Sequence, residues 1–381
     1  MNHDYPTTGL TRRHFVAAAT AGLGLAGFGT TLRAASPVRS RVIIDTDPGV
    51  DDAFALLLAM CSPELRIEAI TAVAGNVPLE LTLPNALRLV EIANRTDIPV
   101  AAGATAPLVR RLVTASYAHG ENGLGGAVFP EPKTAPASEP AADLIQRLVR
   151  KYPGEITLIT IGPQTNIATA LNADPGLAHL VRSIVMMGGS LSGGNITPAA
   201  EFNVYVDPEA ARIVFQSGIP ITMVGLDVTR KTTLTEQHVA MLEAHGNPVS
   251  QAAAAIGRNS IAHHRAKALL SGPNMHDSVA VAAFLQASII RTEPFYVDVE
   301  TSGELTSGET LGYSATAGDL RRAPGASAPA DMPVRGSAPL LGSLKSSPVL
   351  RDHQGPNARV ALDLNAAAFF DLLIGRLGAG T

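Results

Sequence analysis

The sequence predicts an α/β protein with an open, mostly parallel sheet flanked by helices. From Arg41 onward, short runs rich in β-branched residues alternate with helical patterns, which is typical of a parallel sheet covered on both faces. Polar and glycine-rich segments follow several of these runs, where open parallel sheets bind ligands. With 381 residues and 46% hydrophobic content, the chain can build an ample core. We find no internal repeat and predict one domain over residues 40–381.

The elements follow one another in a regular order. The predicted strands span residues 42–45, 67–74, 156–161, 183–187 and 221–224. Helical patterns accompany them at residues 54–60, 79–94, 165–172 and 207–216, followed by two helices within 234–264 and one at 277–287. Residues 315–356 are rich in Ala, Pro, Gly and Ser and predict a long surface loop. A strand at 359–364 and a helix at 366–377 close the chain.

The first 35 residues are set apart from this pattern. A twin-arginine pair in Thr11-Arg12-Arg13-His14-Phe15-Val16 precedes an Ala- and Gly-rich apolar run that is too short to span a membrane. This arrangement resembles a bacterial twin-arginine export signal and predicts a periplasmic or secreted protein with no membrane span in the mature chain. A disordered N-terminal tail is the alternative.

Charge and cysteine usage exclude several classes of protein. The formal net charge is −4, whereas a nucleic-acid partner normally requires a basic domain. The single cysteine, Cys61, excludes an intramolecular disulfide and a metal site built from several cysteines. Because Cys61 ends the predicted apolar helix, we expect a buried thiol.

Residues 42–52 carry the strongest functional signal. Four carboxylates, Asp45, Asp47, Asp51 and Asp52, lie within eight residues directly after an apolar strand. Their mutual repulsion requires compensation, and oxygen ligands of this kind suit Ca²⁺ or Mg²⁺. The alternative is a helix whose N-terminus is stabilised by acids, although one or two acids would suffice for that.

Further polar groups follow the later strands. Asn76 and the bend at residues 161–166 offer amide and backbone carbonyl oxygens, and residues 187–195 form a glycine-rich loop without a phosphate-binding lysine. The tripeptide Glu201-Phe202-Asn203 could grip a polyhydroxylated ligand or form an edge strand.

Histidines and a late acid complete the pattern. Asp277 is an N-cap candidate for the helix that follows it, or it completes an oxygen-ligand set with Asp47 and Asp52. His276 is expected to titrate near neutrality and to donate a proton to a leaving group. His119 is a second loop histidine, and His263-His264 is interpreted as surface or rim.

Taken together, residues 40–377 resemble the inosine–uridine nucleoside hydrolase family of calcium-dependent N-ribohydrolases. The resemblance is carried by ordered motifs, which are Asp45-Thr46-Asp47-Pro48-Gly49-Val50-Asp51-Asp52, His119-Gly120, Gly162-Pro163-Gln164-Thr165-Asn166, Met187-Gly188-Gly189, Asn195, Glu201-Phe202-Asn203, His276-Asp277 and Tyr296-Val297-Asp298-Val299-Glu300. It implies a nucleoside hydrolase-like fold with a Rossmann-like core. It also implies a ribonucleoside substrate and a homo-oligomer, either a dimer or a tetramer.

The resemblance assigns the metal site position by position. Asp47 is expected to bind calcium and to be the general base for the calcium-bound water. Asp52 matches a bidentate ligand, Asp277 a third carboxylate ligand, and Ile161 a ligand through its backbone carbonyl.

The remaining assignments concern the substrate. Asp51 and Asn203 match groups that bond the ribose hydroxyls, with Asn76 close to metal and sugar and Met187 beneath the sugar. The 5′-hydroxyl side is matched by Asn195 and Glu201, next to Phe202. On the side of the base, His276 matches the proton donor and His119 a histidine that lines the pocket. Gly125 stands where many relatives carry an aspartate, which predicts an altered loop near the base.

Two other functions remain open at this point. Asp45-x-Asp47 after an apolar strand is shared with haloacid-dehalogenase-like phosphatases, although Asp51-Asp52 and the late His-Asp have no role there. An exported calcium-dependent nucleoside-binding protein without turnover is the second alternative.

Overall fold

The computed structural model describes residues 1, 39–267, 272–314 and 355–381. Almost all of the predicted export signal and of the predicted loop at 315–356 lies outside the described residues. Within the described part of the chain, no helix has both the length and the apolar character needed to cross a membrane.

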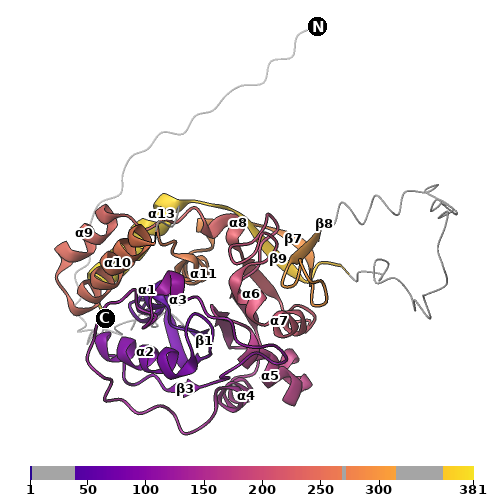
Figure 1. The fold of residues 1–381 in the computed structure, drawn as a ribbon. Helices are drawn as coiled ribbons and strands as arrows, with labels where there is room; N and C mark the ends of the chain where they lie inside the picture. Colours follow the sequence, from indigo (N-terminus) through magenta and orange to yellow (C-terminus); the bar gives the residue numbers. More distant parts are fainter. Residues whose placement is uncertain (2–38, 268–271, 315–354) are drawn as a thin grey trace, which may run out of the picture. The chain divides into compact units, whose positions relative to one another are not determined.

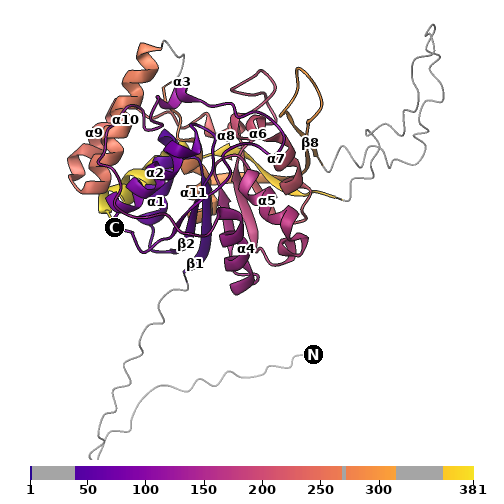
Figure 2. The same ribbon diagram turned by 60° about the horizontal axis from the view of Figure 1, so that its bottom comes forward.

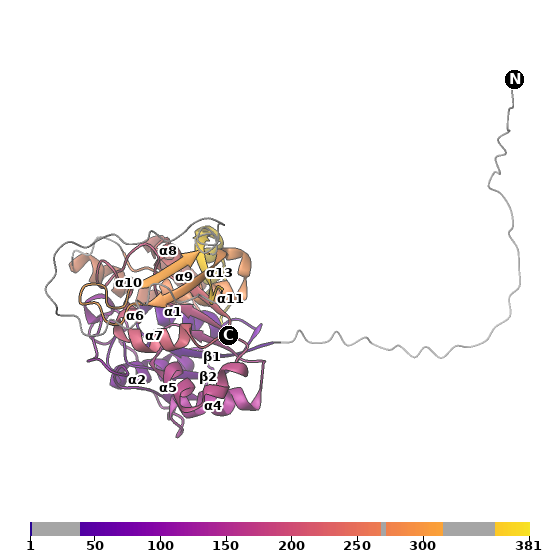
Figure 3. The same ribbon diagram turned by 90° about the vertical axis from the view of Figure 1, so that its right-hand side faces the viewer.

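The described residues form one nine-stranded sheet in the order β3-β2-β1-β4-β5-β6-β9-β7-β8. The strands are β1 (Ser40–Thr46), β2 (Leu65–Ala72), β3 (Val100–Ala102), β4 (Thr157–Thr160), β5 (Ser183–Met187), β6 (Ile221–Val224), β7 (Ile290–Val299), β8 (Thr310–Ser314) and β9 (Ala358–Leu364). The strands from β3 to β9 in this order are parallel, whereas β7 pairs antiparallel with β9 and β8. Figure 3 shows the orange β7–β8 pair beside yellow β9. The predicted open, mostly parallel sheet is confirmed.

Helices pack on both faces of this sheet. They are α1 (Val50–Met60), α2 (Leu79–Ile92), α3 (Ser116–His119), α4 (Ala141–Lys151), α5 (Thr165–Ala173), α6 (Phe202–Val206), α7 (Pro208–Phe215), α8 (Leu226–Thr229), α9 (Glu236–His245), α10 (Pro248–Ala266), α11 (His276–Leu285) and α13 (Ala366–Ala379), with short 3₁₀ segments η1 (Pro175–His179) and η2 (Ala287–Ile289). Figure 1 shows their arrangement, and Figure 2 shows α1 and α2 on one side of β1 and β2, with α4 and α5 on the other.

Strands in the parallel part of the sheet send alternate side chains into two separate cores. Val42 and Ile44 of β1 belong to the core shared with α1, α2, α10, α11 and α13, whereas Ile43 belongs to the core shared with α4, α5 and α7. In β5, Val185 and Ile184 divide in the same way. This period of two explains why the parallel strands read as continuous apolar runs.

The predicted elements agree with the structure where the hydrophobic pattern was continuous. Strands β5 and β6 coincide with the predicted runs, and helix α1 starts at Val50, earlier than predicted. The amphipathic helix α4 and the hairpin strands β7 and β8 were not predicted as elements. Strand β7 alternates exposed and partly buried side chains over its first half, so it lacks an apolar run.

Candidate active site

Three carboxylates converge at the carboxyl ends of the parallel strands. Asp51 and Asp52 lie in the first turn of α1 and Asp277 in the first turn of α11, and one ligand oxygen from each lies within 4.8 Å of the others. All three side chains are buried. Helices α1 and α11 pack against each other, so two segments 225 residues apart in sequence place their acids together. This is the oxygen-rich grouping that a hard cation requires.

Asp277 is not the N-cap of α11. The helix begins at His276 and its N-cap position is Met275, which provides no side-chain hydrogen bond. The N-cap interpretation of Asp277 is therefore wrong. Its side chain groups with Asp51 and Asp52, whereas the predicted set combined it with Asp47 and Asp52.

Asp52 is held by four hydrogen bonds. Its Oδ1 accepts from Thr46 Oγ1 at 2.6 Å and from the Asp47 backbone N–H at 3.2 Å. Its Oδ2 accepts from the Gly49 backbone N–H at 3.0 Å and from Asn76 Nδ2 at 2.9 Å. The helix-start interpretation is thus partly correct for Asp52, because this acid satisfies the turn that opens α1. The same bonds fix the orientation of its carboxylate.

Asp47 has one satisfied oxygen and one free oxygen. Its Oδ2 accepts from the Asn76 backbone N–H at 2.7 Å, whereas its buried Oδ1 has no hydrogen-bond partner among the described residues. Glycines lie close to both oxygens. A Cβ at Gly75 would overlap Oδ2, and a Cβ at Gly162 would lie 2.6 Å from Oδ1. An orphaned carboxylate oxygen in a buried acidic cluster fits a site that holds a cation.

The electrostatics of the cluster point the same way. Burial raises the pKa of Asp47 and of Asp277 well above the ordinary value, with further increases from neighbouring carboxylates. Burial and the charge of Asp52 raise the pKa of Asp51 to about 7. A bound cation would reverse these shifts because it stabilises the ionised carboxylates.

Asp45 stands behind the cluster as structural support. Its Oδ1 accepts from Thr71 Oγ1 and from Asn166 Nδ2, so it joins β1 to β2 and to the start of α5. Burial raises the pKa of Asp45 to about 7. These contacts agree with the absence of a catalytic assignment for this acid.

The opposite wall of the site is built from amides around α6. Asn203 donates through Nδ2 to the Ile161 carbonyl at 3.1 Å and to the Met187 carbonyl at 3.2 Å. Asn195 Oδ1 accepts from the Phe202 backbone N–H at 2.9 Å. The edge-strand alternative for residues 201–203 is wrong, since Phe202 begins helix α6.

Glu201 is the N-cap of α6. Its carboxylate accepts from the backbone N–H groups of Gly189, Asn203 and Val204 at 2.9, 2.9 and 3.1 Å. Burial raises the pKa of Glu201, while these three donors favour its ionised form. Glu201 therefore fixes the glycine-rich loop after β5 as well as lining the cavity.

The two predicted histidines are half-buried, and the pKa of each is lowered. His276 Nδ1 lies 2.7 Å from Thr229 Oγ1, and burial lowers the pKa of His276 to about 4, with a further decrease from the charge of Arg230. The expectation that His276 titrates near neutrality is wrong, because desolvation disfavours its charged form. His119 Nδ1 accepts from the Val50 backbone N–H at 3.1 Å, and burial lowers its pKa to about 4 as well.

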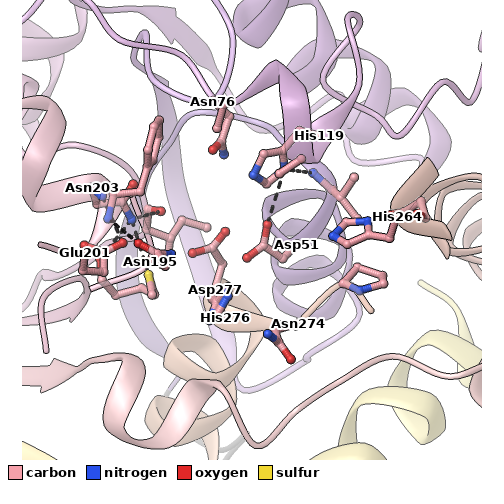
Figure 4. A pocket seen from close by; sticks show the side chains of 18 of the residues that line it. Asp51, Asn76, His119, Asn195, Glu201, Asn203, His264, Asn274, His276 and Asp277 are labelled. Atoms are coloured by element: carbon pink, nitrogen blue, oxygen red, sulfur yellow. Dashed lines mark hydrogen bonds and ion pairs between the residues drawn. The ribbon is translucent and has the colours of Figure 1, made fainter. Parts of the chain in front are cut away.

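A cavity of about 420 Å³ connects these groups (Figure 4). Its lining includes every predicted substrate residue, which are Asp51, Asn76, His119, Met187, Asn195, Glu201, Phe202, Asn203 and His276, together with Ile161 and Asp277. Figure 4 shows the Asn195, Glu201 and Asn203 side chains across the cavity from His119, His264 and Asp51. Asp47 and Asp52 lie behind this surface and are fully buried.

Four polar side chains of the lining were missed or undervalued by sequence reasoning. His264 and Ser260 belong to α10, Tyr117 to α3, and Asn274 to the segment before α11. The spacing of Ser260 and His264, one helical turn apart, was the available signal that they share a face.

Gly125 allows α10 to lie directly on the loop after α3. Its φ is +66°, and a Cβ there would lie 3.0 Å from the Ser260 backbone nitrogen. An aspartate at this position would displace α10. The altered loop that Gly125 predicted is thus a loop whose backbone lies in close contact with the backbone of α10 at Ser260.

Comparisons of sequence and fold find nucleoside hydrolases. A family model described as inosine-uridine preferring nucleoside hydrolase matches residues 42–371. The pyrimidine-specific ribonucleoside hydrolase RihA of Salmonella arizonae is 46% identical over 271 residues, which cover 71% of this chain and 87% of that protein. The protein of the same name from Escherichia coli O1:K1 gives the same identity and coverage.

Solved structures agree. A plant nucleoside hydrolase, PpNRh1, aligns with a TM-score of 0.76 at 31% identity and covers 90% of this chain and 100% of its own. The purine-preferring ribonucleoside hydrolase from Gardnerella vaginalis has a TM-score of 0.76 at 28% identity, with 89% and 98% coverage. These matches are to enzymes, so neither the phosphatase nor the binding protein without turnover is favoured. The chain belongs to the inosine-uridine preferring nucleoside hydrolase family and is a ribonucleoside hydrolase.

Proposed function

We propose that this enzyme releases ribose from ribonucleosides by a calcium-dependent attack of water, with Asp47 as the general base. Two observations carry this proposal: the buried grouping of Asp51, Asp52 and Asp277, and the neighbouring Asp47, whose buried Oδ1 has no hydrogen-bond partner among the described residues. Asp47, Asp52, Asp277 and the Ile161 carbonyl would hold the ion. All of these donors are oxygens, which favours a hard cation, and buried carboxylates that can bind in pairs suit the six to eight ligands of Ca²⁺.

When bound, calcium would hold the ribose 2′- and 3′-hydroxyls and the attacking water in one arrangement. Asp47 accepts a proton from the attacking water. The water oxygen forms a bond to C1′, and the bond between C1′ and the base nitrogen breaks. Asp51 and Asn203 orient the ribose hydroxyls, with Asn76 nearby and Met187 beneath the sugar. Positive charge develops on the ribose ring in this step, as in other glycoside hydrolysis.

The leaving base takes the electron pair of the broken bond and needs a hydrogen-bond donor. We propose that His276 accepts the Thr229 hydroxyl at Nδ1 and donates from Nε2 to the base. A neutral imidazole can fill this role because it still carries one N–H. Asn195 and Glu201, next to Phe202, would contact the 5′-hydroxyl side.

The relatives suggest pyrimidine nucleosides as substrates. The proteins that share 46% identity with this chain are named pyrimidine-specific, whereas the purine-preferring neighbour is 28% identical. We therefore propose that pyrimidine ribonucleosides are hydrolysed faster than purine ribonucleosides.

The decisive test is ribose release from a panel of purine and pyrimidine ribonucleosides, with and without a chelator. We expect turnover that a chelator abolishes and that added Ca²⁺ restores. Turnover of a phosphomonoester without any nucleoside hydrolysis would contradict the proposal. Nucleoside binding without ribose release would contradict it in favour of a binding protein.

Export and assembly complete the proposal. The twin-arginine segment around Arg12-Arg13 supports a periplasmic or secreted enzyme, and the resemblance supports a dimer or tetramer. Replacing both arginines by lysine should keep the enzyme in the cytoplasm, as fractionation of cells would detect. Light scattering of the purified enzyme would measure its mass.

A further inference from the structure

Among the polar side chains that line the cavity near His276, three have hydrogens whose positions are fixed by neighbouring groups. They are His119, His264 and Asn274. In Figure 4, His119 and His264 face the cavity beside Asp51, and Asn274 lies below them, near His276. Their donors and acceptors define which base edge they can bind.

His119 presents a donor. Its Nδ1 accepts the Val50 backbone N–H at 3.1 Å and lies 3.8 Å from Asp51 Oδ1, which is too long for a hydrogen bond. Nδ1 therefore carries the lone pair, and in the neutral ring the hydrogen lies on Nε2.

His264 presents an acceptor. Its Nδ1 lies 3.0 Å from the Ser260 carbonyl, which can only accept, so Nδ1 carries the hydrogen. Nε2 then carries the lone pair. The two histidines thus expose opposite hydrogen-bonding atoms to the same cavity, because one bonds to a backbone N–H and the other to a backbone carbonyl.

Asn274 presents a second donor. Its Oδ1 accepts from Thr233 Oγ1 at 2.8 Å, and a backbone bridge between the same two residues fixes their spacing. The amide oxygen is engaged in this contact, so the amide nitrogen is the group available to a ligand.

We propose that these groups form a donor–acceptor–donor set that selects uracil over cytosine, with His264 as the specificity-determining residue. Uracil offers a carbonyl, an N–H and a second carbonyl along its edge, which pair with His119, His264 and Asn274 respectively or in the reverse order. Cytosine offers a carbonyl, an unprotonated nitrogen and an amino group. It therefore places a lone pair against the His264 lone pair and an amino group against a donor.

This inference rests on the proposed function and adds a choice within the pyrimidines. The names of the relatives separate pyrimidines from purines but do not separate uracil from cytosine. A buried acceptor that meets another acceptor is left unsatisfied, which is the usual origin of strong discrimination between similar ligands.

The test compares kcat/KM for uridine, cytidine and 3-methyluridine in the full-length enzyme with calcium. We expect uridine to exceed cytidine by at least about tenfold. 3-Methyluridine lacks the N–H that His264 would accept, so its hydrolysis should fall to a similar extent. Both losses should appear mainly in KM if the contact exists equally in the ground and transition states.

His264→Ala and Asn259→Ala provide the matched pair of variants. Asn259 also lies on α10, but it is exposed, and its side chain donates to the Ala255 carbonyl of its own helix. His264→Ala should reduce the ratio of uridine to cytidine hydrolysis to within about threefold, because it deletes the discriminating acceptor. Asn259→Ala should keep the ratio of the unmodified enzyme.

Each outcome has a distinct meaning. Equal hydrolysis of uridine and cytidine would overturn the base assignment but leave the hydrolase function intact. A uridine preference that persists in His264→Ala would overturn the role of His264. Absence of ribose release from every nucleoside would instead overturn the proposed function on which the inference rests.

Discussion

Asp45 and Asp47 are two buried acids, two residues apart, with different surroundings. Each keeps one buried oxygen without a hydrogen-bond partner among the described residues. The other oxygen of Asp45 bonds Thr71 and Asn166 and joins strands, whereas Asp47 lies beside the acidic cluster. Strand β1 ends between them at Thr46, so Asp45 lies within the sheet and Asp47 in the loop that faces the site. These positions explain why Asp45 supports the structure, whereas Asp47 is the acid proposed to react.

This difference can be tested with the isosteric amides. Asp47→Asn should lower kcat by about 10³-fold, within the range expected for loss of a general base, because the amide cannot accept the proton. Asp45→Asn should change kcat by less than about threefold, since its amide oxygen can still accept both hydrogen bonds. Ribose release gives the rates, and thermal melting checks that both variants fold. Near-normal activity of Asp47→Asn would contradict the proposed base.

His276 offers a second test at this scale. His276→Ala should slow natural nucleosides by about 10²-fold but should slow a riboside with a good leaving group, such as p-nitrophenyl riboside, by less than about tenfold. Since burial lowers the pKa of His276 to about 4, the histidine is neutral above pH 5.5. The size of the effect should therefore be constant between pH 5.5 and 8 in the rate profiles. Equal losses for both classes of substrate would exclude a role in leaving-group departure.

Residue types predicted the acids well and the base pocket poorly. Asp277 could be predicted as a ligand through the family resemblance, because its residue type alone also suited an N-cap, and it does meet Asp51 and Asp52. His264 and Asn274 could not, because their roles depend on which backbone group each contacts. A sequence also carries no information on burial, which is why the titration of His276 was predicted wrongly.

At the scale of elements, α10 is placed by the glycine loop beneath it. Gly125 and Gly126 both have positive φ, at +66° and +88°, but only Gly125 lies against Ser260. A side chain added at either position would therefore strain the backbone to a similar extent. Only at Gly125 would it also collide with α10.

Alanine substitutions separate these two effects. Gly125→Ala should raise KM several-fold because it displaces Ser260 and His264 from the cavity, and its stability should fall by about 1–3 kcal/mol. Gly126→Ala should lower stability by about 1 kcal/mol while KM stays unchanged, because nothing lies within 4 Å of its Cβ. Steady-state kinetics and denaturant unfolding measure both quantities. An unchanged KM for Gly125→Ala would show that α10 is not positioned by this contact.

The parallel part of the sheet was predictable because buried strands leave continuous apolar runs, as in β5 and β6. The hairpin of β7 and β8 was not, because one of its faces is largely exposed and its pattern is interrupted. The Ala141–Lys151 helix was missed although its buried positions Ala141, Leu144, Ile145, Leu148 and Val149 follow the helical period.

For the whole molecule, the acidic cluster couples folding to pH and to calcium. The pKa of Asp51 is about 7 in the folded chain against about 3.9 in an unfolded one, so the folded state binds more protons between these values. The contribution of Asp51 to the free energy of unfolding of the metal-free protein therefore falls as pH rises from about 4 to 7. Asp47 and Asp277 shift in the same direction. The lowered pKa values of His119 and His276 act oppositely, but only below about pH 6.5.

Calcium should therefore stabilise the protein more at pH 8 than at pH 6. At a concentration 100 times Kd, Ca²⁺ should raise Tm by about 5 °C at pH 8, and by less at pH 6, where protons compete for the carboxylates. Differential scanning fluorimetry of chelator-treated protein measures this shift, with NaCl of equal ionic strength as the control. The same shift at both pH values would contradict the linkage.

The two glycines beside Asp47 have a consequence for how this enzyme can change. Gly75 and Gly162 take no part in the reaction, yet even one added methyl group at either would press on the carboxylate that does. Tolerance to substitution should therefore be as low at these two positions as at the acid itself. In a saturation mutagenesis map of activity, Asp47, Gly75 and Gly162 should all reject substitution. The two glycines should do so because the Asp47 carboxylate occupies the space that a side chain would need.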